Sequence, residues 1–138
     1  MKSLIILLVL ATIIVPTTQT YVKSCENGVS KPIKVQISDC QRLPCRIKKN
    51  QIVSVNISFN TTQSTKTLQS KVFFKKFSGK FDFSLNFDRP LKAYEQVDYE
   101  LKMLFQGFYP LNYLKLYVTF IGDNNKLFTC FAVDILVI

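Results

Sequence analysis

Apolar and polar residues alternate along much of the chain. In residues 33–37 the apolar side chains of Ile33, Val35 and Ile37 share one face, and polar residues separate them. The same period of two recurs in residues 53–59, 81–87, 99–105, 114–120 and 131–137. Such alternation is typical of antiparallel strands that turn one face to the core and the other to water.

Turn-forming residues separate these stretches, as at Asn27-Gly28, Ser78-Gly79, Tyr109-Pro110 and residues 122–125. Asparagine, glycine, proline and serine favour turns because they adopt or fix unusual backbone angles. No stretch shows helical periodicity, and the chain has room for about six or seven strands of this kind. The sequence therefore predicts an all-β fold, a sandwich of two sheets.

The beginning of the chain is predicted to be a secretory signal peptide. A lysine precedes an apolar run, residues 4–15, which is shorter than the roughly 20 residues of a membrane span. Small residues precede the expected cleavage site between Thr20 and Tyr21. We therefore expect a signal peptide of residues 1–20 and one domain of residues 21–138, secreted to the extracellular space or the endolysosomal lumen.

Four cysteines, Cys25, Cys40, Cys45 and Cys130, follow this leader. An even number of cysteines in a secreted chain predicts disulfides. Four cysteines allow three pairings, and sequence alone does not choose among them.

Two glycosylation sequons begin at Asn56 and Asn60. By the alternation of its stretch, Asn56 falls on the polar face, where a glycan can be carried. We expect a glycan at Asn56 and also consider Asn60 a candidate.

The chemical inventory argues against an enzyme. The chain has no histidine, which is the commonest general base and metal ligand. Disulfides would use every cysteine, and there is no glycine-rich phosphate loop. We therefore expect no catalytic residues, no metal and no cofactor.

The formal net charge of +9 has two interpretations. The lysines are either solvated residues that keep sheet edges from pairing, or they favour transient contact with anionic membranes. Nucleic acid is a poor partner for a secreted protein, and the basic pairs Lys48-Lys49 and Lys75-Lys76 make no long stripe.

The apolar strand faces are the candidate binding site. They hold most of the twelve phenylalanines and would meet between the two sheets. A filled core and a ligand cavity have the same periodicity, so both interpretations stay open. By their shared parity we expect the following residues to face the inter-sheet space: Val55, Ile57, Val72, Phe74, Phe81, Phe83, Leu101, Met103, Phe105, Val118, Phe120, Phe131 and Val133.

Several segments together resemble the ML-domain lipid-recognition family, which includes the Niemann-Pick type C secreted sterol carrier and the group 2 mite allergens. The resemblance begins at Cys25 and continues through residues 33–37, the short Cys40–Cys45 loop and residues 47–59. Its most specific part is residues 118–130, Val-Thr-Phe-Ile-Gly-Asp-Asn-Asn-Lys-Leu-Phe-Thr-Cys.

The resemblance implies an immunoglobulin-like sandwich with an apolar cavity between its sheets and non-covalent lipid binding without turnover. It implies disulfides between Cys25 and Cys130 and between Cys40 and Cys45. It also suggests Tyr109 as a residue at the cavity mouth. We expect a monomer whose cargo is one lipid, with sterol as the first choice.

Two other functions compete with the secreted lipid carrier. The first is an innate-immune recognition module that binds a microbial glycolipid, with fatty acids and phospholipids as further ligands. The second is a structural or signalling sandwich with a solid core and no ligand. A cavity would exclude the second, and the identity of a bound lipid would separate the carrier from the recognition module.

Overall fold

The structure is a computed structural model that describes residues 19–26, 28–76, 79–87, 90–104 and 113–138. For residues 75–76 and 79–87 the backbone alone is described. These parts contain nine strands. The strands are β1 (Lys23–Ser24), β2 (Lys34–Ile37), β3 (Cys45–Ile47), β4 (Ile52–Asn60), β5 (Leu68–Lys76), β6 (Gly79–Phe87), β7 (Gln96–Leu104), β8 (Tyr113–Ile121) and β9 (Leu127–Val137).

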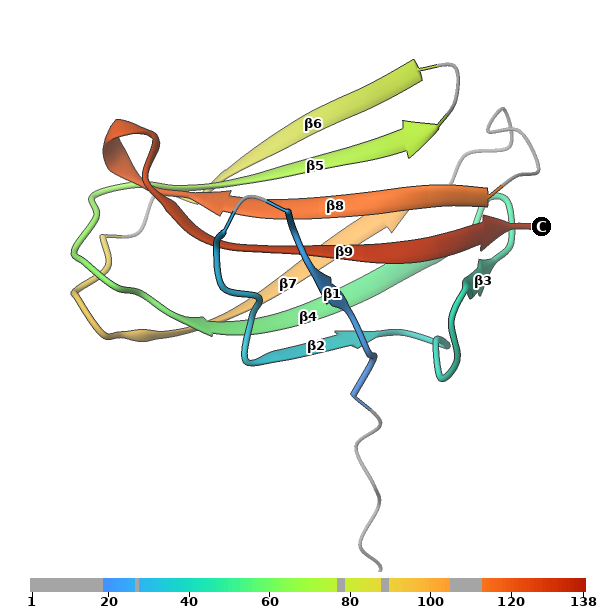
Figure 1. The fold of residues 1–138 in the computed structure, drawn as a ribbon, viewed down its shortest axis with the longest axis horizontal. Coiled ribbons are helices and arrows are strands. Elements are labelled where there is room, and N and C mark those ends of the chain that lie inside the picture. The colour runs from blue at the N-terminus through green and yellow to red at the C-terminus, as the bar shows by residue number, and fades with distance from the viewer. Residues whose placement is uncertain (1–18, 27, 77–78, 88–89, 105–112) are drawn as a thin grey trace, which may run out of the picture.

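The strands form two layers (Figure 1). One sheet has the order β1-β9-β8-β5-β6, and the short β3 also pairs with β9, in parallel. The other sheet has the order β2-β4-β7 and is antiparallel throughout. The predicted all-β class is confirmed, and the fold is an immunoglobulin-like β-sandwich. Among the described residues, no helix has the length and apolarity needed to span a membrane.

The alternation along β4 shows why these residues form a sandwich. Val53, Val55, Ile57 and Phe59 are each at most 2% exposed, whereas the residues between them are partly or fully exposed. Removing each such apolar side chain from water contributes about 1.5–3 kcal/mol. The buried residues of both sheets form one continuous apolar cluster between the layers.

Three positions depart from the predicted alternation. Ile33 is 60% exposed, because it lies just outside β2 at the open edge of the smaller sheet. Thr119 of β8 and Ala132 of β9 are buried although both lie on predicted polar faces. The segment after β1 lies against β9, since Cys25 is bonded to Cys130 and the Thr129 hydroxyl donates to the Ser30 carbonyl at 2.8 Å.

The structure contains the two disulfides that the family resemblance implies. Cys25 and Cys130 are bonded with a Cα–Cα distance of 5.6 Å and join the N-terminal segment to β9. Cys40 and Cys45 are bonded with a Cα–Cα distance of 5.0 Å and close the loop between β2 and β3. No described cysteine is free.

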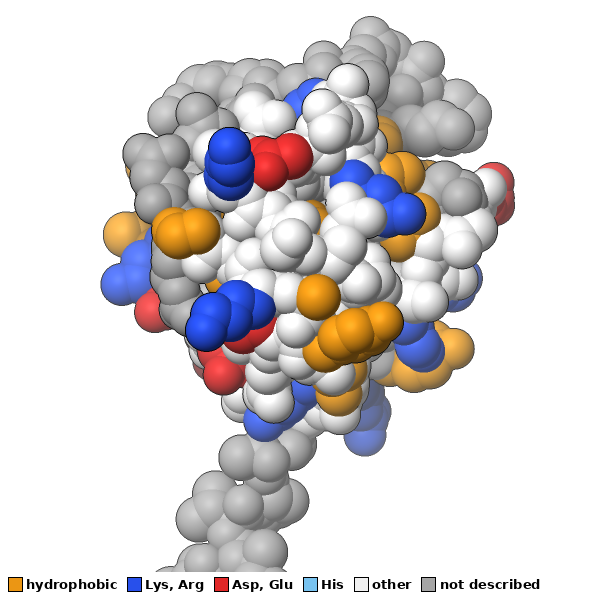
Figure 2. Space-filling model, turned by 90° about the vertical axis from the view of Figure 1, so that its left-hand side faces the viewer, with side chains coloured by type: hydrophobic (Ala, Val, Ile, Leu, Met, Phe, Trp, Pro, Cys, Tyr) orange, Lys and Arg blue, Asp and Glu red, His pale blue; other side chains and the backbone are white. Residues whose placement is uncertain are grey.

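One end of the sandwich, which we call the hairpin end, comprises residues 61–67, residues 90–95 and the β8–β9 turn, where a 3₁₀ turn spans Asp123–Asn125. The backbones of Thr65 and Leu91 exchange two hydrogen bonds there, of 2.8 and 3.0 Å. Figure 2 looks at this end, where acidic and basic side chains stand beside exposed hydrophobic ones.

The Asp123 carboxylate ties the loops of the hairpin end together. It accepts from the backbone N–H of Lys66 at 2.7 Å and from the hydroxyl of Thr67 at 2.8 Å. The pKa of Asp123 is lowered, first by the Lys66 backbone hydrogen bond and next by the Thr67 hydroxyl.

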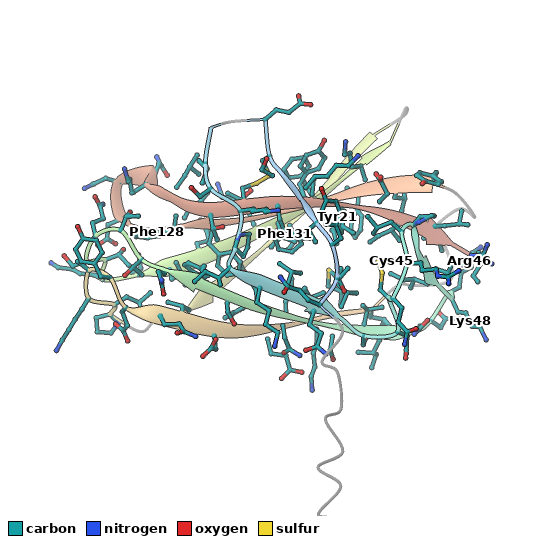
Figure 3. The ribbon with its side chains drawn as sticks, turned by 60° about the horizontal axis from the view of Figure 1, so that its bottom comes forward. Tyr21, Cys45, Arg46, Lys48, Phe128 and Phe131 are labelled. Carbon is teal, nitrogen blue, oxygen red and sulfur yellow. A yellow bond between two sulfur atoms is a disulfide. The ribbon has the colours of Figure 1, made fainter. Side chains whose placement is uncertain are left out.

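The opposite end, which we call the β3 end, comprises the Cys40–Cys45 loop, β3, residues 48–52 and the adjoining ends of β7, β8 and β9. Five large apolar side chains of the described residues are exposed there, and they come from five different segments: Leu43 (36%), Ile52 (64%), Leu104 (52%), Tyr113 (54%) and Ile138 (46%). Arg46 and Lys48 are also exposed at this end, far from Phe128 of the hairpin end (Figure 3).

Candidate functional site

The candidate site is the apolar space between the two sheets. Strands β5, β8 and β9 supply one wall, and β4 and β7 supply the other. Those predicted site residues whose side chains are described are all buried, with exposures from 0% to 6%: Val55, Ile57, Val72, Phe74, Leu101, Met103, Val118, Phe120, Phe131 and Val133. The strands thus bring side chains that are far apart in sequence into one apolar cluster.

Four predicted site residues are described less fully. The backbone of β6 pairs Phe81 with Phe74 and Phe83 with Val72, which places both positions in the same sheet as the rest of that wall. Phe105 and Tyr109 lie outside the described residues.

Aromatic rings join the two walls toward the hairpin end. Phe120 of β8 has its ring centroid 4.9 Å from that of Phe59 on β4. The same ring meets Tyr99 of β7 edge to face, with centroids 5.4 Å apart. Aromatic pairs in these geometries contribute about 0.5–1.5 kcal/mol beyond the burial of their area. This part of the interior is therefore filled by protein side chains.

The interior toward the β3 end is lined mainly by aliphatic side chains. Val53 pairs with Met103, and Val55 pairs with Leu101, across β4 and β7. The labelled Phe131 comes from β9 in the other sheet and is fully buried (Figure 3).

The predicted set omitted several residues of the same cluster. Val53 and Phe59 lie on the inner face of β4, Leu116 lies on that of β8, and Ile135 lies on that of β9. Each shares parity with a predicted neighbour on its own strand, so the alternation of the sequence could have found all of them.

No Asp, Glu, Lys or Arg whose side chain is described is buried. The described buried polar residues are threonines and Ser70, and no buried side-chain nitrogen or oxygen in this part of the chain lacks a hydrogen-bond partner. No group of described residues could hold a metal ion. An uncharged interior without spare polar groups suits an apolar ligand, because a buried unpaired polar group would cost free energy.

Hollows lined by described residues also open on the outside of the sandwich. One of about 330 Å³ lies on the polar face of the smaller sheet, between Lys34, Asn56 and Asp98. Another of about 630 Å³ surrounds the Cys40–Cys45 loop, beside Arg42 and Arg46. The carboxyl of Asp98 is part of the polar lining of the first hollow. The hydrogen bond from the Ser58 hydroxyl is the main cause that lowers the pKa of Asp98. Neither hollow has the apolar lining expected for a lipid chain.

Comparison with known proteins gives two kinds of similarity. The family model of the ML domain matches residues 19–137. A search of curated proteins finds no significant match. Among solved structures, a Niemann-Pick type C2 protein from the Japanese carpenter ant superimposes with a TM-score of 0.74 and 18% identity, covering 86% of this chain and 99% of that chain.

The C-terminal domain of wzt also superimposes, with a TM-score of 0.63 and 11% identity, covering 89% of this chain and 81% of that chain. At these identities the two superpositions establish the fold alone. The family match is independent evidence, because it comes from the sequence and spans most of the chain.

Proposed function

The chain belongs to the ML domain family, and from that premise we propose that it is a secreted carrier that holds one apolar lipid between its two sheets. The observation that carries the proposal is the inter-sheet interior, apolar on both walls and free of charged residues throughout its described part. Each Å² of apolar ligand surface removed from water there would contribute about 25 cal/mol. Binding of this kind needs no catalytic group, so we propose a carrier without enzymatic activity or cofactor.

Sterol is the proposed cargo. A sterol is a rigid apolar body with a single hydroxyl, and the described interior offers apolar walls without charges. We assign contact with the lipid to the predicted inter-sheet residues, including Phe81, Phe83 and Phe105, and we assign the mouth to Tyr109.

The alternative is recognition of a microbial glycolipid. This alternative is favoured by Arg46 and Lys48, which are exposed at the β3 end and could meet an acidic head group. A fatty acid or a phospholipid would use the same combination of apolar interior and basic surface.

We also propose transient contact between the β3 end and anionic membranes. Ile52 and Leu104 are cross-strand partners and are both exposed, which makes an apolar patch on the surface. The backbone of Lys49 donates to the carbonyl of Ile138, so basic and exposed apolar side chains lie close together. Such a combination favours anionic bilayers, where a basic residue contributes about 1 kcal/mol.

Vesicle flotation would test this contact. We expect more binding to phosphatidylcholine vesicles that contain phosphatidylglycerol than to phosphatidylcholine alone, with binding reduced by salt. The double variant Arg46→Ala with Lys48→Ala should lose binding, while the control Lys71→Ala, at an exposed position of β5, should retain it. Equal loss in both variants would contradict a specific docking end.

Glycosylation at Asn56, and at Asn60, remains a prediction. Both side chains are exposed on β4, which supports the proposal, since a glycan cannot enter a core. The mass of the secreted protein before and after glycosidase treatment would decide it.

We further propose that the carrier is a monomer.

Ligand binding tests the main proposal directly. Native mass spectrometry of the protein from secreting cells should show one bound lipid, and fluorescent sterol should bind to the delipidated protein. Val118→Phe adds bulk to the fully buried inner face of β8. In a cavity it should weaken lipid binding while stability is kept, whereas in a packed core it should cost about 1–3 kcal/mol.

The matched control is Tyr117→Phe, which places the same side chain one position away on the outer face of β8. The Tyr117 ring stacks on the Phe73 ring with centroids 4.6 Å apart, and Tyr117→Phe keeps this aromatic pair. A parent protein that binds no lipid, together with loss of stability in Val118→Phe, would favour the solid-core sandwich over the carrier. A bound microbial glycolipid in place of sterol would favour the recognition module.

A further inference from the structure

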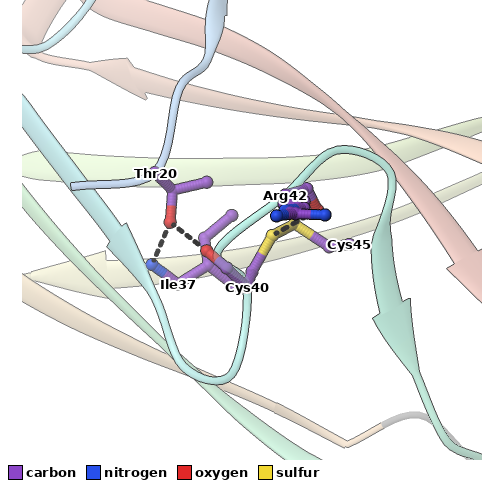
Figure 4. The surroundings of a disulfide bond; sticks show 5 residues. All are labelled: Thr20, Ile37, Cys40, Arg42 and Cys45. Atoms are coloured by element: carbon purple, nitrogen blue, oxygen red, sulfur yellow. Dashed lines mark hydrogen bonds between the residues drawn. A yellow bond between two sulfur atoms is a disulfide. The ribbon is translucent and has the colours of Figure 1, made fainter. Parts of the chain in front are cut away.

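Thr20, the last residue of the predicted signal peptide, is part of the folded domain. Its side chain is 4% exposed. Its backbone N–H donates to the carbonyl of Val35 at 2.9 Å. Its hydroxyl donates to the carbonyl of Cys40 at 3.2 Å and accepts from the N–H of Ile37 at 3.0 Å (Figure 4). One threonine therefore makes three hydrogen bonds to β2 and to the short disulfide loop.

These hydrogen bonds satisfy backbone groups at a sheet edge. β2 is an edge strand, and Ser38, just after it, donates toward β4 through a 2.9 Å bond to Ser54. In an antiparallel strand, the backbone N–H groups of adjacent residues point to opposite sides of the strand. The N–H of the buried Ile37 therefore points away from β4, and Thr20 is its partner. A buried backbone group that loses its partner destabilises the fold.

Residues 19–25, which we call the N-terminal strap, continue from this edge to the other sheet. The Gln19 side-chain amide donates to the carbonyl of Ile33 at 3.3 Å. Val22 is buried in the apolar cluster, and Lys23 pairs with Ala132 of β9. The strap thus links the smaller sheet to the larger one before it reaches the Cys25–Cys130 disulfide (Figure 1).

We propose that the signal peptide is removed on the N-terminal side of Gln19, so that the mature protein retains Gln19 and Thr20. The step is hydrolysis of one peptide bond: water adds across it, leaving a carboxylate on the leader and an ammonium group on the mature chain. Thr17 and Thr18 are small residues suited to the position before the bond. This inference rests on the proposed secretion and places the boundary before the one that we expected between Thr20 and Tyr21.

Two observations support this boundary independently of the cleavage motif. The match to the ML domain begins at residue 19. Cleavage after Thr20 would remove all three of its hydrogen bonds and put a new charged terminus at Tyr21, beside the buried Val22.

The N-terminus of the secreted protein tests the proposal. The full chain would be expressed in secreting eukaryotic cells, and the tryptic peptide that ends at Lys23 would be identified by mass spectrometry. We expect it to begin at Thr18 or Gln19, in the latter case partly as pyroglutamate. A peptide that begins at Tyr21 would overturn the boundary while leaving secretion intact. A chain that still carries Met1 would overturn both the boundary and the predicted leader.

Substitution of Thr20 gives a second test in the same full-length chain. Thr20→Val keeps the shape and removes the hydroxyl, so we expect the Tm to fall by about 5 °C, with the N-terminus unchanged. Thr20→Ser should recover most of the loss, and Tyr21→Phe, at a 67% exposed position, should leave the Tm unchanged. If Thr20 were instead the residue before the cleaved bond, valine would shift or block processing with no change in Tm, and that result would overturn the proposal.

Discussion

The hairpin end and the β3 end of the sandwich differ in what they expose. At the hairpin end Phe59, Leu91 and Phe128 are at most 5% exposed, and hydrogen bonds join the loops that cover them. At the β3 end Ile52 and Leu104 are more than half exposed, although they also lie on regular strands. Among the described residues, the hairpin end is packed with aromatic side chains and exposes one large apolar side chain, Tyr94 (83%), whereas the β3 end exposes several.

The difference indicates that the two ends of the sandwich have different roles. At the hairpin end the aromatic cluster around Phe120 packs the two sheets together, and the Asp123 hydrogen bonds join the β8–β9 turn to the segment before β5. Folding leaves much of the apolar surface of the exposed side chains at the β3 end in water, which supports the proposed contact of that end with lipid. Stability should then depend on the hairpin end and be insensitive to changes at the β3 end.

The largest effect is expected from the long disulfide. Replacing Cys25 and Cys130 together by alanine opens a link between residues separated by 105 positions, which should cost about 4–5 kcal/mol in the chain-entropy model. Replacing Cys40 and Cys45 opens a link over 5 positions at the β3 end and should cost about 2 kcal/mol. Urea unfolding of both variants measures the losses. A larger loss from the short disulfide would mean that the β3 end is also a determinant of stability.

Truncation of buried and exposed side chains compares the two ends directly. Phe120→Ala removes the ring that meets both Phe59 and Tyr99, and it should cost about 3–5 kcal/mol. The control Ile52→Ala, at a 64% exposed position, should change stability by less than about 0.5 kcal/mol. Chemical denaturation gives both values. Similar losses in the two variants would remove the distinction between the ends.

A methyl group added at the β8–β9 turn should have an intermediate effect. The Cβ of Gly122→Ala would meet the Phe128 ring and lie 2.8 Å from the Thr65 hydroxyl oxygen. We expect a loss of about 1–3 kcal/mol from this overpacking, measured by urea unfolding. The control Gly28→Ala adds a methyl group where nothing lies within 4 Å, although its φ of 75° adds backbone strain. A loss in Gly122→Ala no greater than in this control would contradict tight packing at the hairpin end.

The smallest expected effect is a dependence of stability on pH. The folded state lowers the pKa of Asp123, so its stabilisation is complete above the pKa of the unfolded chain, about 3.9, and is lost as the pH falls through the folded pKa. Asp123→Asn should therefore lower the Tm at neutral pH and reduce its fall in acid. Thermal unfolding between about pH 2 and pH 7 tests this. An unchanged acid profile would show that Asp98 or other carboxyls carry the dependence.

Much of the fold could be predicted because local pattern and tertiary burial agree. Parity alone identifies the inner residues of β4, β7 and β8, and those that the structure describes are buried except Tyr99, which is partly buried against the core. Periodicity failed where strands are too short to show it, as in β1 with two residues and β3 with three. It also failed at Thr119 and Ala132, which lie on the face of the larger sheet where the Cys25–Cys130 disulfide attaches the N-terminal segment.

The sequence by itself determined the class of the fold, the inward faces of the long strands and the cysteines available for disulfides. These features depend on side-chain period and composition, which are local properties of the chain. Tertiary structure alone decided that Thr20 hydrogen-bonds to β2 and to the Cys40–Cys45 loop, and that the Phe120 ring meets rings of the other sheet. Each of these depends on which distant segment lies opposite a residue, and two residues with the same local pattern can differ in that respect.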